Sequence, residues 1–135
     1  MMKNLAIALL IALSAFTLAC GGYGSSQTAA PPTAGTMPTI ATLAPGSTTH
    51  GDAAFVLTVT GTNYSATAVI NFGGVAQTTN QVSATQLTAT IAAADIANAG
   101  TVPVTVTDPA VAGTGPYGGG GTLAETSGPM TFTVN

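Results

Sequence analysis

The sequence predicts an all-β protein built as one antiparallel β-sandwich of about seven short strands, and three observations predict it. Apolar and polar residues alternate in a series of short segments, which is the pattern of half-buried strands. Gly, Pro and Asn recur between these segments about every ten residues, which is typical of turns in a sandwich. Only 4% of the 135 residues are charged, so the polarity of the outer faces comes from threonine, which suits a pleated surface.

The predicted elements follow one another along the second part of the chain. The expected strands cover residues 39–43, 53–60, 67–72, 75–79, 86–92, 101–107 and 129–135. Their apolar side chains share a face, as Phe55, Leu57 and Val59 do in the second strand. Residues 93–99 are predicted to form one or two helical turns. Pro103 indicates an edge strand or a bulge, because proline has no N–H to donate to a neighbouring strand.

The charge balance excludes nucleic-acid binding. The formal net charge is −3 at pH 7, and the only Lys or Arg in the chain is Lys3, close to the N-terminus. Contacts to nucleic-acid phosphates need Lys or Arg side chains, and the predicted domain has none. We therefore expect no nucleic acid among the partners of this protein.

The N-terminus has the pattern of a signal peptide. Lys3 is followed by a mostly apolar run, residues 5–19, which only Ser14 and Thr17 interrupt. A short cationic segment and an apolar run of this length are typical of secretory signal peptides. A membrane-spanning helix needs about 20 apolar residues, which makes an uncleaved anchor the less favoured alternative. We therefore expect residues 1–19 to be removed on export.

The end of this run resembles a lipoprotein cleavage site. Thr17-Leu18-Ala19 precedes Cys20, the single cysteine of the chain, and is similar to a bacterial lipobox whose leucine lies one place late. The resemblance implies that Cys20 carries lipid, and Gly21 after it implies the outer membrane of the cell envelope. A lone cysteine in an exported protein cannot form an internal disulfide, which lipidation explains. The alternative is ordinary secretory cleavage near Ala19 with Cys20 unmodified.

Residues 20–37 are predicted to be the lipidated cysteine and a flexible linker. Gly, Ser, Thr, Ala and Pro dominate this segment, and it has no apolar periodicity. From residue 21 onward it reaches at most about 55–60 Å when fully extended. The sequence therefore predicts a leader, a tether and one folded domain, residues 38–135.

Six phrases in the predicted domain occur in the order of a known module. They read PTI with LAPG (38–40 and 43–46), FVLTVTGTNY (55–64), VINFGG (69–74), SATQLTATI (83–91), AGT with VTV (99–101 and 104–106) and TFTV (131–134). This order resembles the IPT/TIG domain, the immunoglobulin-like module of plexin-type receptors, Rel-type transcription factors, some starch-acting enzymes and many bacterial envelope proteins. The resemblance implies an immunoglobulin-like β-sandwich and brings no catalytic residues, because the family has none. The glycine-rich residues 108–128 are expected to form an extended final loop.

The residues that could carry chemistry form no recognisable catalytic or metal-binding pattern. His50 lies two residues from Asp52, but no motif in the chain resembles that of an activated serine or cysteine nucleophile. The acids Asp52, Asp95, Asp108 and Glu125 are scattered along the chain, and no calcium-binding loop motif is present. We therefore expect no catalytic residues, no metal site and no cofactor.

Two tyrosines carry different expectations. Tyr64 matches a family position that packs at the end of the second strand, so we expect it in the core. Tyr117 lies in a Gly-Pro-Tyr-Gly sequence at the tip of the long loop. Aromatic side chains often serve as anchors at protein interfaces, so Tyr117 is the candidate interaction residue. The alternative is that Tyr117 covers one end of the sandwich.

These observations predict a non-enzymatic lipoprotein of the bacterial cell envelope, whose domain is a structural or protein-interaction module. Its expected partner, besides the membrane, is another envelope protein or a second copy of the chain. Contact is expected through a sheet face, an edge strand or the loop around Tyr117. The alternative is a glycan- or polysaccharide-binding accessory module, which the resemblance to modules of starch-acting enzymes implies. The absence of tryptophan counts against this alternative, because sugars usually stack on exposed aromatic rings.

Overall fold

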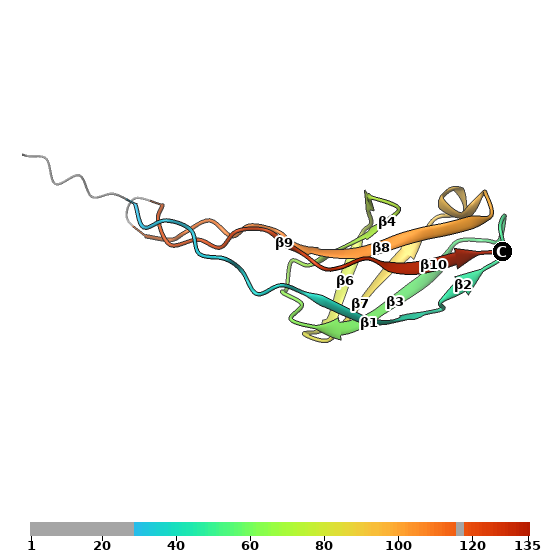
Figure 1. Ribbon diagram of the computed structural model, residues 1–135, viewed down its shortest axis with the longest axis horizontal. Coiled ribbons are helices and arrows are strands. Elements are labelled where there is room, and N and C mark those ends of the chain that lie inside the picture. Colours follow the sequence, from blue (N-terminus) through green and yellow to red (C-terminus); the bar gives the residue numbers. More distant parts are fainter. Residues whose placement is uncertain (1–28, 116–117) are drawn as a thin grey trace, which may run out of the picture.

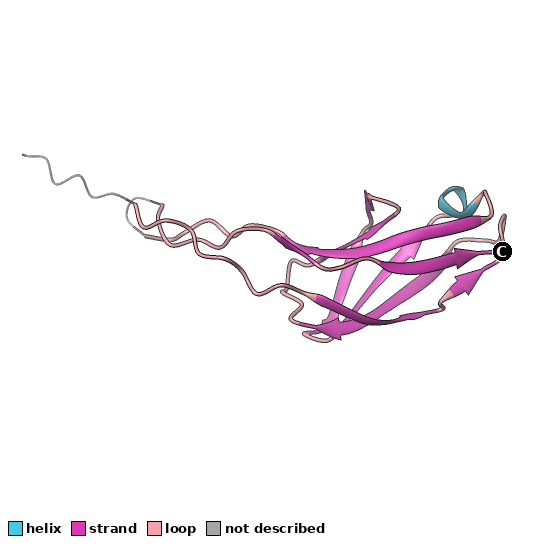
Figure 2. Ribbon diagram, in the orientation of Figure 1, coloured by secondary structure: helices cyan, strands magenta, loops and turns pink. Residues whose placement is uncertain are grey.

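The computed structural model describes residues 29–115 and 118–135, and in this part the chain consists of strands, loops and one short 3-10 helix (Figure 2). The predicted all-β class is confirmed. The strands are β1 (Thr39–Ala44), β2 (Ser47–Thr48), β3 (Phe55–Thr62), β4 (Val69–Phe72), β5 (Val75–Ala76), β6 (Thr79–Ser83), β7 (Gln86–Ile91), β8 (Gly100–Asp108), β9 (Glu125–Thr126) and β10 (Met130–Val134). The helix η1 (Ala93–Ile96) lies between β7 and β8, where one or two helical turns were expected.

The strands form two sheets that lie one over the other (Figure 1). One sheet has the order β1-β3-β7-β6, and the other has the order β2-β10-β8-β4-β5 with β9 paired to β8. All strand pairs are antiparallel except β2 with β10, so the expectation of a purely antiparallel arrangement is wrong at this pair. The reason is that the chain leaves the first sheet after Ala44, and Ser47 then pairs with Thr133 in the second sheet.

The two sheets enclose one apolar core. The side chains that the alternating pattern placed inward make up almost all of it, so this prediction is confirmed. The buried members are Leu57, Val59, Tyr64, Ala68, Ile70, Phe72, Leu87, Ala89, Ile91, Ile96, Val104, Val106, Phe132 and Val134. The ring of Phe132 stacks on Phe55 of the opposite sheet, with 5.6 Å between ring centroids, and meets Phe72 edge-on at 5.3 Å. Burying such a side chain stabilises the fold by about 1.5–3 kcal/mol.

The expected strand at residues 75–79 is two separate strands in different sheets. β5 ends at Ala76, and the chain then crosses to the other sheet, where β6 begins at Thr79. Two hydrogen bonds hold the crossing against β4. The amide of Ile70 donates to the hydroxyl of Thr79 at 2.8 Å, and the amide of Gln77 donates to the carbonyl of Ile70 at 2.8 Å.

Pro103 lies in an interior strand, so the expectation of an edge strand or a bulge is wrong. β8 is flanked by β10 on one side and by β4 on the other. The ladder with β4 ends at the pair Phe72 and Val104, one residue short of the proline. The carbonyl of Pro103 accepts a hydrogen bond from Gly73 at 2.9 Å, so this side of the proline faces the turn after β4. The missing N–H therefore removes no bond from the ladder.

Beyond the two sheets, three chain segments run together as a narrow projection, which we call the arm (Figure 1). The arm consists of residues 29–36, 109–115 and 118–124. Thr122 forms bridges with both Thr33 and Val111, and the amide of Thr33 donates to the carbonyl of Gly121 at 2.9 Å. The arm therefore joins the described part of the predicted linker to the long loop between β8 and β9.

Glycine residues allow the backbones of the arm segments to lie in direct contact with one another. A Cβ atom on Gly119 would collide with the backbone of Ala30, and one on Gly121 would collide with the carbonyl of Val111. Only a residue without a side chain fits where backbones meet in this way. The glycine-rich composition of the long loop is thus a packing requirement of the arm.

Candidate functional site

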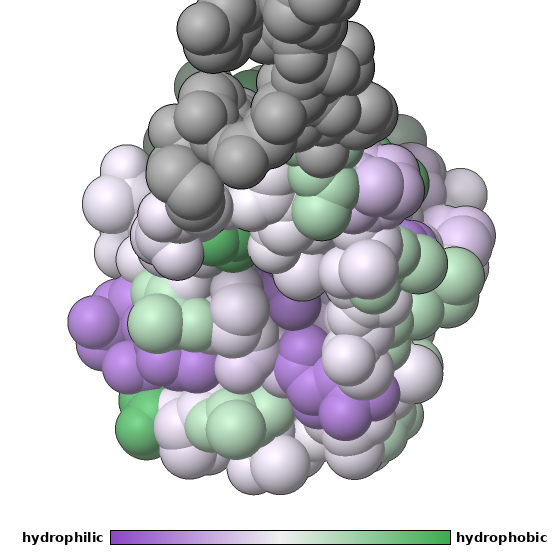
Figure 3. Space-filling model, turned by 90° about the vertical axis from the view of Figure 1, so that its left-hand side faces the viewer, coloured by the Kyte–Doolittle hydropathy of each residue, from purple (hydrophilic) through white to green (hydrophobic). Residues whose placement is uncertain are grey.

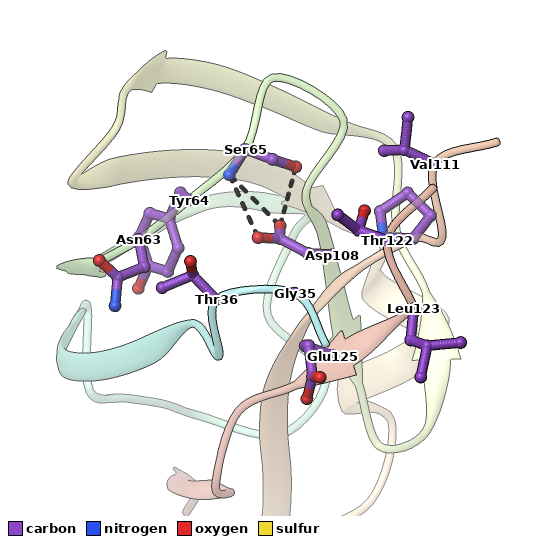
Figure 4. A pocket seen from close by; sticks show the side chains of 11 residues that line it. Gly35, Thr36, Asn63, Tyr64, Ser65, Asp108, Val111, Thr122, Leu123 and Glu125 are labelled. Atoms are coloured by element: carbon purple, nitrogen blue, oxygen red, sulfur yellow. Dashed lines mark hydrogen bonds between the residues drawn. The ribbon is translucent and has the colours of Figure 1, made fainter. Parts of the chain in front are cut away.

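The base of the arm holds a pocket of about 320 Å³, where the arm meets the ends of β3 and β8 (Figure 4). Asn63 and Thr36 lie on the same side of it as Tyr64, and Val111, Thr122 and Leu123 lie on the side away from Tyr64. The lining residues are Gly35, Thr36, Asn63, Tyr64, Ser65, Asp108, Pro109, Val111, Thr122, Leu123 and Glu125. This mixture can accept a small polar ligand, and we treat it as the first candidate site.

Asp108 is engaged in holding the pocket wall together. Its carboxylate accepts hydrogen bonds from the hydroxyl of Ser65 at 3.0 Å and from the amide of Ser65 at 3.3 Å. The two residues are 43 positions apart in the chain, so this contact fixes the loop after β3 against the end of β8. Bonds to a charged acceptor are about twice as strong as neutral ones. The primary role of Asp108 is therefore structural.

Tyr64 lies in the core, with 3% of its surface exposed, so the expectation for this residue is confirmed. Its hydroxyl has no hydrogen-bond partner among the described residues and lies so close to Gly61 that a Cβ atom there would collide with it. Burial, followed by the negative charge of Asp108, raises the pKa of Tyr64 to about 12. The phenol is therefore neutral at physiological pH and offers no base or nucleophile to the pocket.

Glu125 is the second carboxylate at the pocket, directly opposite Asp108 in the pairing of β8 with β9. Like charges in such a pair repel each other and also favour a cation between them. Calcium, however, takes six to eight oxygen ligands. No three residues of the types His, Cys, Asp and Glu lie close enough to hold a metal ion anywhere in the described part of the chain.

His50 and Asp52 lie at the other end of the molecule and make separate contacts. The Nδ1 atom of His50 is 2.8 Å from the carbonyl of Asn135. The carboxylate of Asp52 accepts from the hydroxyl of Thr48 at 2.9 Å and from the amide of Thr49 at 3.0 Å. These bonds lower the pKa of Asp52, and the bond from the Thr48 hydroxyl has the larger effect. The structure thus uses both side chains to hold the loop after β2.

The second candidate surface is the outer face of the sheet β1-β3-β7-β6. None of these four strands contains Asp, Glu, Lys or Arg. Val56 on β3 and Val82 on β6 are more than half exposed. Val56 also lines a shallow hollow of about 240 Å³ with Asn80, Thr88 and Thr90. This sheet therefore presents a wide uncharged surface of threonine, asparagine and valine.

The two residues singled out from the sequence, Cys20 for lipidation and Tyr117 for interaction, lie outside the described residues. Near the second, the amide of Gly118 donates to the carbonyl of Gly115 at 2.8 Å. This bond joins two segments of the arm at its outer end.

Comparisons of the chain with protein-family models, with characterised proteins and with solved structures found no match. Among the described residues, no helix is both long enough and apolar enough to cross a membrane.

Sequence reasoning did not find the pocket or the arm. Asp108 was expected only as a scattered acid, because nothing in the sequence points to Ser65 as its partner. The arm has no alternating pattern, since it is held by backbone bonds and glycine contacts that hydropathy does not register. The one available signal was the length and glycine content of the segment 108–128.

Proposed function

We propose that this protein is a non-enzymatic cell-envelope lipoprotein whose immunoglobulin-like β-sandwich is a structural or protein-interaction module. The strand order supports the immunoglobulin-like assignment. The sheet β1-β3-β7-β6 has the order of the A, B, E and D strands of that fold. The path β10-β8-β4-β5 has the order of its G, F, C and C′ strands. The phrases that resemble an IPT/TIG domain agree with this assignment.

The uncharged sheet β1-β3-β7-β6 is the observation that carries the interaction role. Soluble domains usually protect their sheets with charged side chains, lysine above all. The four strands here have none. The centres of protein interfaces are depleted of charged residues, because a buried unpaired charge is costly. A partner protein can therefore cover this sheet without desolvating a charge.

The partner in this proposal is another envelope protein or a second copy of the chain. An added lysine on β6 tests the idea. Asn80 is exposed on β6, the edge strand of the uncharged sheet, and pairs with Thr88 of β7, so Asn80→Lys places a charge on that face. Thr131→Lys is the matched control, because Thr131 is exposed on β10 in the other sheet.

Sedimentation of the wild type and the two lysine variants, together with crosslinking in native envelopes, gives the readout. Asn80→Lys should abolish the associated species, and Thr131→Lys should keep it. Circular dichroism should show the same fold in all three proteins. Equal association of both variants would refute the uncharged sheet as the interface.

The lipoprotein part of the proposal rests on Cys20 and its surroundings in the sequence. It predicts that the mature chain begins at Cys20 and carries lipid there, and that it fractionates with membranes. Mass spectrometry of the protein from its host gives the mass of the first residue and its modification. In Cys20→Ala the domain should leave the membrane fraction. An unmodified Cys20 in the mature protein would contradict this part.

The pocket at the arm base favours glycan binding as the second candidate function. Carboxylates and hydroxyls in a pocket of about 320 Å³ are suitable partners for the hydroxyl groups of a sugar. The side chain of Glu125 lies beside Gly35 at the pocket edge. If a polysaccharide binds there, Glu125→Gln should weaken retention of the domain on a polysaccharide column. Unchanged retention of both proteins would remove this alternative at the pocket.

A further inference from the structure

The arm carries no charge. Residues 29–36, 109–115 and 118–124 contain no Asp, Glu, Lys, Arg or His. Two of the most exposed large apolar side chains of the described chain lie here: Val111 is 56% exposed and Leu123 is 50% exposed. A hollow of about 410 Å³ beside them is lined mainly by alanine, proline, glycine and these two residues. Surfaces of this kind are usually covered by a partner or by lipid.

The arm is also a built element. The amide of Leu123 donates to the carbonyl of Thr33 at 2.9 Å, and the amides of Val111 and Thr122 each donate to the carbonyl of the other at 3.0 and 2.9 Å. These bonds hold the three arm segments, and with them the two apolar side chains, in a fixed relation to one another. The same residues in a flexible linker would have no fixed positions, whereas in the arm the two apolar side chains form one defined surface.

The charged side chains of the described domain lie outside the arm segments, at the base of the arm or at the opposite end of the sheets. Asp52, in the loop after β2, and Asp95, in η1, lie at the end that also holds the C-terminus, opposite the arm (Figure 1). Asp108 and Glu125 lie only at its base. Seen from the arm side, the surface is mostly of intermediate hydropathy, with small separate hydrophilic and hydrophobic areas (Figure 3).

The length of chain before the arm limits how far the arm can be from the proposed anchor. Ala29 is at the outer end of the arm, and eight residues separate it from Cys20. Eight residues span at most about 30 Å when extended. A tether this short keeps the arm at an effective concentration in the millimolar range at the membrane. Even a weak affinity for lipid then places the arm on the surface.

We propose that the arm lies against the surface of the lipid bilayer and orients the two sheets away from it. This inference rests on the proposed lipoprotein, because the anchor supplies the proximity. The occupant is a phospholipid surface, contacted through Val111 and Leu123. The arm has no basic residue, so the contact does not depend on anionic headgroups.

The composition of the chain permits a direct test in vesicles. The chain has no tryptophan and one cysteine, so Leu123→Trp introduces a single fluorescent reporter and Cys20 gives a single coupling point. The chain from Cys20 onward is coupled through this thiol to a maleimide phospholipid in phosphatidylcholine vesicles. Brominated phosphatidylcholine then quenches any tryptophan that reaches the acyl chains. Val82→Trp on β6 is the matched control, because Val82 is 54% exposed and lies in the sheet.

Quenching at position 123 should be at least about threefold stronger than at position 82, in vesicles with and without anionic lipid. Val111→Asp in the Leu123→Trp protein should reduce quenching to the level of the control, since a carboxylate resists burial in lipid. Equal quenching at both positions would overturn the proposal, and so would quenching that Val111→Asp leaves unchanged. Val111→Trp is a second arm reporter if Leu123→Trp does not fold.

The coupling is chemical, so the vesicle result does not depend on natural lipidation. Failure of the lipoprotein proposal shows as an unmodified Cys20 in the mass spectrum of the natural protein. Failure of the arm proposal shows as equal quenching in the coupled vesicles. The two outcomes are therefore separately observed.

Discussion

Ionisation of Tyr64 should make the stability of the domain fall at alkaline pH. The hydroxyl of Tyr64 is buried and has no hydrogen-bond partner in the part of the chain that the structure describes. Burial and the charge of Asp108 raise its pKa from 10.0 to about 12. In the unfolded chain the pKa returns to about 10. The folded state therefore favours the neutral phenol.

The sign of the effect follows from the higher pKa in the folded state. The stabilisation is complete below about pH 10 and is lost as the pH rises toward 12. A pKa difference of about two corresponds to about 3 kcal/mol of unfolding free energy. Tyr64→Phe cannot ionise and should not show this loss. At neutral pH it should be at least as stable as the wild type, because a buried hydroxyl without a partner costs about 1–3 kcal/mol.

Urea unfolding followed by circular dichroism, repeated between about pH 9 and pH 12, measures this free energy in both proteins. The wild type should lose about 3 kcal/mol relative to Tyr64→Phe across this range. Equal losses in the two proteins would refute the reasoning. A variant less stable than the wild type at neutral pH would show that the hydroxyl has a partner.

Three further predictions address the core, the pocket wall and the arm. Phe132→Ala should destabilise the domain by about 3–5 kcal/mol in urea unfolding, because Phe132 is fully buried. Thr131→Ala is the control, since Thr131 is exposed, and it should cost less than about 0.5 kcal/mol. Similar losses in the two variants would contradict the assignment of Phe132 to the core. Asp108→Asn should lower the pKa of Tyr64 below about 12 in a phenolate absorbance titration, and an unchanged value would argue against the charge of Asp108 as a cause. Gly119→Ala should speed amide hydrogen exchange in the arm and leave the core strands protected, because its Cβ collides with arm backbone. Unchanged exchange in the arm would contradict this account of its packing.

The parts of the fold that alternation predicts correctly are those where a strand has one face in the core. Leu57 and Val59 on β3 and Val104 and Val106 on β8 are fully buried, as their spacing indicates. Alternation predicts these positions reliably because it reflects only that one face of the strand is buried. It does not depend on which strands pair with it.

The parts of the fold that the sequence did not predict depend on contacts with segments that are distant in the same chain. β6 follows β5 after two residues but joins the other sheet, and the bond between Ile70 and Thr79 that marks this crossing leaves no pattern in the sequence. Pro103 was misassigned because its effect depends on where the adjacent ladder ends. The pocket at the arm base was missed because its polar residues come together from distant segments, as Ser65 and Asp108 do.

Crosslinking in native envelopes tests the central claim, that an anchored sandwich binds a protein partner through its uncharged sheet, most directly. The account predicts one discrete crosslinked product in the wild type, which Cys20→Ala and Asn80→Lys strongly reduce and Thr131→Lys preserves. No discrete product in the wild type, or the same product in equal amount in all four proteins, would contradict it.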